Sequence, residues 1–104
     1  MVKYVGNKAE NSVVPLVINV INKDEKYKLR HVIRHSPTGF QWGYMGSGPA
    51  DTALSILVDF CQRKNLDLKI AEDNYMEFKE KFIAQQGNLL EIHGAEIEKW
   101  LKNK

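Results

Sequence analysis

The sequence has little of several things that would point to a specialised class of protein. Cys61 is its only cysteine, which excludes an internal disulfide and a zinc site made of several thiolates. No apolar run approaches the roughly 20 residues of a membrane span, and the start MVKYVGNKAE has no signal-peptide core. The formal net charge is only +2, so a nucleic-acid partner would need cations clustered locally. We therefore expect a cytoplasmic protein with no membrane partner.

What is present is the composition of an ordinary globular protein, with 43% hydrophobic and 27% charged residues in a chain of 104. A chain of this length fits one domain, and no internal repeat, linker or low-complexity segment divides it. Strand-like and helix-like segments both occur. The sequence therefore predicts a single α+β domain over residues 1–104, in which a small antiparallel sheet (a hairpin plus short strands) packs against about three helices.

The predicted strands are short and rich in β-branched and aromatic residues. Pro15 cannot donate to a strand ladder, so the second strand either starts after it or lies at an edge. The charged segment Asn22–Lys26 is predicted to be the turn of a hairpin. The predicted strands are Val2–Gly6, Val13–Ile21, Tyr27–Arg34, Phe40–Tyr44 and Leu89–Ile92.

The strongest helix signal follows a glycine-rich segment. Pro49 suits the first helical position, which would put Gly48 at the N-cap and Asp51 in the first turn, where a carboxylate interacts well with the helix dipole. Apolar residues then recur at helical spacing through Cys61 over so much of the circumference that the helix should lie between the sheet and another element. Two further helices are predicted, one from Leu68 or Glu72 to Gln86, and one over Ala95–Lys102.

The glycine-rich segment is also the leading candidate for a ligand site. Helix N-termini present free N–H groups and the positive end of a dipole, so anions bind there readily, although tight turns and close packing select the same glycines. Aromatic residues just before it could stack on a base, although aromatics at period two are more often core. The candidate ligand-binding residues are Arg34, His35, Trp42, Tyr44, Gly46, Ser47 and Gly48, and the ligand would be a nucleotide or another phosphate-bearing small molecule.

A second candidate surface is basic. Alternation along the third predicted strand gathers cations on one face, and these could follow a phosphate backbone. Charged strand faces also serve solubility and discourage edge pairing. The residues of this alternative nucleic-acid site are Lys26, Lys28, Arg30 and Arg34.

Catalytic and metal chemistry have weaker support. Ser36 is next to His35 rather than on a nucleophile elbow, and no third group stands at a matching spacing, so we predict a binding protein and not an enzyme. His31 and His93 lack metal-ligand spacing, so no metal or other cofactor is expected. Cys61 falls on the apolar stripe and is predicted to be a small core residue.

The segment HSPTGFQWGYMGSGPADTALSIL closely resembles the hallmark of a small domain family of unknown function found in bacteria, archaea and phages, HSPxGFxWGYxGSGPAxxAL. Tyr4 and Gly6 are similar to that family's opening Tyr-x-Gly, and Leu89–Leu101 to its closing strand and helix. Met45 departs from the pattern, because the family more often has glycine there. The resemblance implies no activity or site residues, but the family's occurrence in phages and mobile elements suggests a viral or anti-defence setting.

Three hypotheses follow in order. The first is a non-enzymatic binding module for an anionic, nucleotide-like ligand at the start of the central helix. The second is a protein-interaction module, an inhibitor of a host factor or a homodimer, that uses the hairpin or the aromatic loop. The third is nucleic-acid binding through the basic strand face.

Overall fold

The computed structural model describes residues 1–9 and 16–104, and this part of the chain holds four β-strands and three α-helices. The strands are β1 (Lys3–Asn7), β2 (Asn19–Asn22), β3 (Glu25–Lys28) and β4 (Leu89–His93). The helices are α1 (Ser47–Lys64), α2 (Lys69–Phe78), which continues into a π-helical turn η1 (Lys79–Ile83), and α3 (Gly94–Lys102). The α+β prediction is therefore confirmed. Val13, Val14 and Pro15 of the second predicted strand lie outside the described residues.

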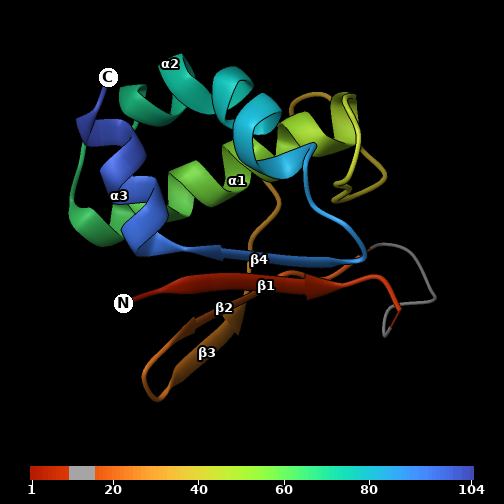
Figure 1. The fold of residues 1–104 in the computed structure, drawn as a ribbon, viewed down its shortest axis with the longest axis horizontal. Helices are drawn as coiled ribbons and strands as arrows, with labels where there is room; N and C mark the ends of the chain where they lie inside the picture. The colour runs from red at the N-terminus through yellow and green to blue at the C-terminus, as the bar shows by residue number, and fades with distance from the viewer. Residues whose placement is uncertain (10–15) are drawn as a thin grey trace.

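The strands form one antiparallel sheet in the order β3-β2-β1-β4. The first strand lies inside it, with Lys3 paired to Ile21 of β2 on one side and to His93 of β4 on the other. The predicted hairpin is present, and its turn is tighter than predicted because Asn22 already pairs with Glu25. All the helices lie on one side of this sheet (Figure 1), so its other face is left without a helical cover.

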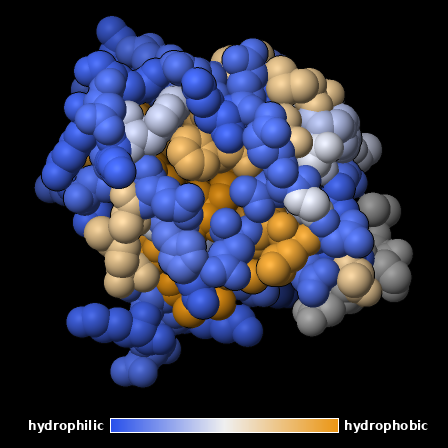
Figure 2. All heavy atoms as spheres, viewed as in Figure 1, coloured by the Kyte–Doolittle hydropathy of each residue, from blue (hydrophilic) through white to orange (hydrophobic). Residues whose placement is uncertain are grey.

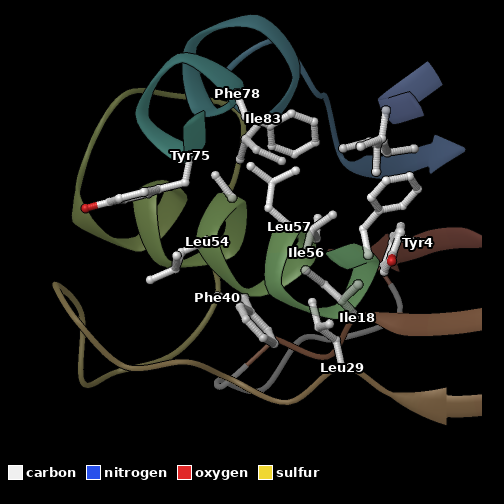
Figure 3. Close-up of a cluster of buried hydrophobic side chains, with 14 of the residues drawn as sticks. Tyr4, Ile18, Leu29, Phe40, Leu54, Ile56, Leu57, Tyr75, Phe78 and Ile83 are labelled. Atoms are coloured by element: carbon white, nitrogen blue, oxygen red, sulfur yellow. The ribbon is translucent and has the colours of Figure 1, made fainter. Parts of the chain in front are cut away.

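Helix α1 is the centre of the hydrophobic core, as its apolar stripe predicts. Every residue from Gly48 to Leu57 is buried, and so are Phe60 and Cys61. Figure 3 shows α1 between two groups of side chains, with Ile18, Leu29 and Phe40 on the sheet side and Phe78 and Ile83 on the other. The prediction that this helix lies between the sheet and another element is confirmed.

The second helical segment ends earlier than predicted and changes type. The i→i+5 bond from the Ala84 N–H to the Lys79 carbonyl marks the π-helical turn, and the helical segment ends at Ile83 rather than Gln86. An aromatic cluster lies beside this turn. The ring centroids of Phe78 and Phe82 are 4.8 Å apart, and those of Phe82 and Trp100 are 5.7 Å apart. This cluster joins the segment to α3.

Three predicted strands are wrong in part. The second begins at Asn19, so Leu16, Val17 and Ile18 of its predicted range lie before it. The third ends at Lys28 rather than Arg34. The Leu29 N–H still donates to the Ile18 carbonyl, but farther along the chain the backbone bonds to α1, where the Val32 N–H donates to Ser55 Oγ at 2.9 Å. In the segment 40–44 only Phe40 pairs with another chain segment in strand fashion, through an isolated bridge to Leu16. The Gln41 N–H donates instead to Thr52 Oγ1 at 3.1 Å.

The surface viewed in Figure 2 is mostly hydrophilic, with hydrophobic atoms gathered near its middle. Among the described residues, no helix is both long enough and apolar enough to cross a membrane.

Candidate functional site

The glycine-rich corner begins α1 two residues earlier than predicted. The N-cap is Gly46 rather than Gly48, the helix starts at Ser47, and the Ala50 N–H makes the first intrahelical bond, to the Gly46 carbonyl at 3.0 Å. Helix geometry leaves the N–H groups before this bond without intrahelical partners, and Pro49 has none to offer. Ser47, the first residue of the helix, is exposed.

The glycines of this corner are packed against the chain's own side chains. A Cβ on Gly48 would lie 2.8 Å from Cβ of Gln41, which is closer than two carbon atoms can approach. A Cβ on Gly46 would lie 3.0 Å from the ring of Tyr44. Close packing is therefore sufficient to explain the glycine at position 48, and Tyr44 covers part of the space above Gly46.

An internal carboxylate already occupies the anion-binding backbone nearby. Asp51 is fully buried in the second turn of α1, so the predicted place in the first turn is wrong. Its carboxylate accepts the consecutive backbone N–H groups of Arg34, His35 and Ser36 at 2.8–3.3 Å and lies 2.9 Å from Nε2 of His31. We call this arrangement the Asp51 latch. Three successive amides converging on one anion resemble the nests that hold phosphates in other proteins.

The latch also sets the charge state of its carboxylate. Burial alone would raise the pKa of Asp51, but hydrogen bonds from His31 and from the amides of His35, Ser36 and Arg34 outweigh burial and lower that pKa below its ordinary value. Asp51 is therefore a permanent negative charge at neutral pH. A second anion next to it would be repelled.

The side chains of Arg34 and His35 both turn toward α2. The Arg34 guanidinium pairs with Glu72, and hydrogen bonding by that guanidinium holds the pKa of Glu72 below its usual range. Nε2 of His35 lies 2.8 Å from the hydroxyl of Tyr75, with their rings stacked. The side-chain polar atoms of these two predicted ligand residues therefore already have protein partners.

The two predicted stacking residues have opposite environments. Trp42 is fully buried, and its Nε1–H donates to the Gly87 carbonyl at 2.9 Å, so its ring faces the core. Tyr44 is 50% exposed, and among the predicted ligand residues it is the aromatic that a ligand can reach. The predicted common face of Phe40, Trp42 and Tyr44 is wrong, because the backbone there is not a strand.

The predicted basic row does not form one face, because β3 ends at Lys28. Lys26 and Lys28 lie on the helix-free face of the sheet. Arg30 lies beyond the end of β3 and, like Lys28, lines a hollow of about 270 Å³ that Asp59 and Gln62 of α1 also border. Arg34 lies farther away, paired with Glu72.

The helix-free face of the sheet keeps Lys26 and Lys28 of the predicted row and adds Lys3 of β1. In register, one row across β3, β2, β1 and β4 consists of Lys26, Ile21, Lys3 and His93, and the next consists of Lys28, Asn19, Val5 and Glu91. Tyr27 points the other way and bonds to Asp59 of α1, which fixes the orientation of β3. We call the lysines Lys3, Lys26 and Lys28, together with Val5 and Ile21, the outer sheet patch. Among the described residues none of its lysines forms an ion pair.

The sequence alone did not identify several residues of the Asp51 latch and of the outer sheet patch. His31, Glu72 and Tyr75 contribute to the latch and its neighbourhood from positions far along the chain, and no local motif links them to Asp51. Lys3 was overlooked because its strand carries no second cation. The period-two alternation of β1, together with the short hairpin, was the signal that could have found it.

The geometry defines a small α+β domain in which a buried carboxylate on the central helix ties down the loop that follows a hairpin. The chain belongs to a family of unknown function, DUF6166, whose sequence model matches residues 4–103. No curated protein and no solved structure matches the chain.

Proposed function

We propose that this chain is a non-enzymatic binding module that presents its outer sheet patch to an acidic surface of a partner protein. The observation that carries the proposal is the patch itself, in which three lysines without ion-pair partners lie in the same two rows as half-buried Val5 and Ile21, on a face that no described helix covers. Glu91 of β4 lies beside Val5 on this face and is paired with His93. Three lysines at the far end of the helices, Lys64, Lys102 and Lys104, are by contrast held by glutamates.

A protein partner suits the patch better than a nucleic acid does. Proteins that bind single strands combine cations with aromatic side chains on which bases stack. Among the described residues of the sheet, the aromatic ones, Tyr4 and Tyr27, both point toward α1 and bond to Asp59. The centre of the patch is aliphatic instead, as in an interface that excludes water around an apolar contact. The phage or mobile-element setting that the resemblance implies would make a host protein the natural partner.

The patch would act mainly on the rate and specificity of association. Complementary charges steer encounter and are screened by salt, whereas the buried aliphatic centre gives the contact that persists after docking. Affinity for the partner should therefore fall as ionic strength rises. A homodimer is disfavoured at this patch, because a two-fold contact would bring the same lysines against one another.

The test compares two variants, each of which replaces three lysines by glutamates. Lys3→Glu/Lys26→Glu/Lys28→Glu alters the patch, and Lys69→Glu/Lys81→Glu/Lys99→Glu alters three lysines of the helices. Each protein is immobilised and exposed to host lysate with and without nuclease treatment, captured proteins are identified by mass spectrometry, and the purified candidate is then titrated at 50 and 300 mM salt.

We expect an acidic partner that the unaltered chain and the helix variant both retain, with binding at least tenfold weaker in the patch variant. Equal retention by both variants would exclude the patch. Binding that is lost on nuclease treatment would favour the nucleic-acid alternative at Lys26 and Lys28 over a protein partner.

A second candidate is an anionic, nucleotide-like ligand at the start of α1. What favours it is Ser47, which is exposed at a helix N-terminus next to accessible Tyr44. Calorimetry with mono-, di- and cyclic nucleotides tests it, using Ser47→Pro as the variant, because proline fits the first helical position while removing both the N–H and the hydroxyl. Absence of binding across the panel, or equal binding by the variant, counts against this ligand.

A further inference from the structure

A groove of about 460 Å³ lies at the opposite end of α1 from the latch. The last turns of α1, the α1–α2 connection, α2 and α3 lie together on the helical side of the sheet (Figure 1). Residues of these four segments line the groove. Its volume falls within the roughly 300–1,000 Å³ of small-molecule sites. Nothing in the sequence or family points to this groove.

The interior of the groove is apolar. Its walls come from Phe60 of α1, Leu66 of the connection, Ile70 of α2 and Leu101 of α3. Leu66 is 40% exposed and Ile70 and Leu101 are partly buried, so hydrophobic surface remains open to solvent here. Covering such surface with an apolar ligand removes it from water, which is favourable by about 25 cal/mol per Å².

The rim of the groove is cationic. Three of the lining residues are lysines, Lys64, Lys102 and Lys104, against one acid, Glu98. Glu98 lies between two of them, with its carboxylate 3.4 Å from Nζ of Lys64 and 3.5 Å from Nζ of Lys102. Lys104 pairs with Glu77 and lies over the ring of Trp100. The rim therefore keeps an excess of positive charge above an apolar interior.

We propose that this groove binds a small amphiphilic carboxylate, with its hydrocarbon body against Phe60, Leu66, Ile70 and Leu101 and its carboxylate between Lys64 and Lys102. The arrangement matches the two halves of such a molecule: an apolar interior for the chain, and two ammonium groups that already share one carboxylate. Glu98 is the internal competitor, because it occupies the cations that the ligand's head would contact. This site is separate from the outer sheet patch, so the two proposals stand or fall independently.

Three probes separate the contributions of the hydrocarbon chain and of the carboxylate to binding. Octanoate carries both, octanol carries the same chain without charge, and acetate carries the charge without the chain. Titration followed by calorimetry and by chemical-shift changes in residues 60–70 and 98–104 should show octanoate binding at least tenfold tighter than octanol, with no saturable binding of acetate. Equal binding of octanol and octanoate, or absence of octanoate binding, overturns the proposal.

Replacing the lysines of the rim by glutamine tests their contact with the ligand's carboxylate, and it adds no negative charge that would repel that carboxylate. Lys64→Gln/Lys102→Gln/Lys104→Gln should weaken octanoate binding at least tenfold and leave octanol binding unchanged. The matched control, Lys69→Gln/Lys81→Gln/Lys99→Gln, removes the same charge from other positions on the helices and should bind octanoate as the unaltered chain does. An equal loss in both variants would mean that only overall charge matters, which would contradict the site.

A gain of binding provides the sharpest test, because loss of structure cannot imitate it. Glu98→Gln removes the competing carboxylate and frees Lys64 and Lys102, so octanoate should bind severalfold tighter while octanol is unaffected. Glu80→Gln, on η1 and outside the groove, should change neither. Unchanged or weaker octanoate binding by the Glu98 variant would overturn the assigned position of the head group.

Discussion

The two ends of α1 show opposite uses of polar and apolar groups. At its start, Asp51 is fully buried and receives three backbone amides and His31, while Gly48 packs on Gln41. At its end, Phe60 and Lys64 border an open groove whose apolar walls and cations are only partly engaged. The motif that resembles a ligand site mostly serves to hold the fold together, and the open surface lies where the sequence looks ordinary. A glycine-rich helix start is thus evidence of close packing before it is evidence of a ligand.

If that contrast is correct, changes at the start of α1, where the Asp51 latch lies, should lower the stability most. Asp51→Asn keeps the size of the side chain but replaces an acceptor by an amide that faces donors, so we expect the free energy of unfolding to fall by about 3 kcal/mol. Urea unfolding followed by circular dichroism measures it. Asp73→Asn, on the exposed face of α2, should change the same quantity by less than about 0.5 kcal/mol. Equal effects of the two changes would contradict the latch.

A smaller loss of stability is expected from Gly48→Ala. The added methyl group collides with Cβ of Gln41, which cannot swing away as a side-chain tip could, so the expected cost is about 2 kcal/mol in thermal or urea unfolding. Gly87→Ala is the control, because a Cβ there meets no atom within 4 Å. If Gly48→Ala proved neutral like its control, the packing explanation of the motif would be wrong.

Acid should weaken the latch in a way that identifies Asp51. Its pKa is lowered in the folded state, so its contribution to stability is complete above the unfolded value of about 3.9 and is lost as pH falls through the lower folded value. As pH falls from about 5 to below the unfolded value, the unaltered protein should lose more stability than Asp51→Asn loses. Parallel pH profiles for the two proteins would show that the carboxylate is not held as described.

The open end should show the reverse pattern, with little change in stability and a clear change in binding. Leu66→Ser alters an exposed wall of the groove, and we expect its unfolding free energy to change by about 0.5 kcal/mol or less. Octanoate binding by the same variant should weaken severalfold. A large loss of stability would mean that this end contributes to holding the fold as much as the other end does.

Much of the fold could be predicted because its signals are local. Pro49 and the apolar stripe after it locate α1, the charged turn locates the hairpin, and Gly87-Asn88 separates η1 from β4. The end of β3 at Lys28 could not be predicted. The backbone N–H groups of the chain that follows donate to side chains of α1 instead, Val32 to Ser55 and Ser36 to Asp51, and these partners are 23 and 15 residues apart in the sequence. Nothing near Lys28 signals that competition.

The candidate sites were predicted less well for the same reason. Arg34 and His35 were placed near the start of α1, and the latch does join their backbone to that helix. Their side-chain partners, Glu72 and Tyr75, lie 38 and 40 residues away, so no spacing rule connects them. The groove needs three helices to exist, and none of its apolar residues differs locally from an ordinary core position.

The position of β1 has a consequence for how the protein is made. This strand is internal to the sheet, and one of its two neighbours is β4, which is synthesised more than 80 residues later. Until the ribosome has delivered that final strand, one edge of β1 has no partner and offers its backbone to any nascent chain nearby. Chaperone dependence during translation is therefore to be expected even for a chain this small.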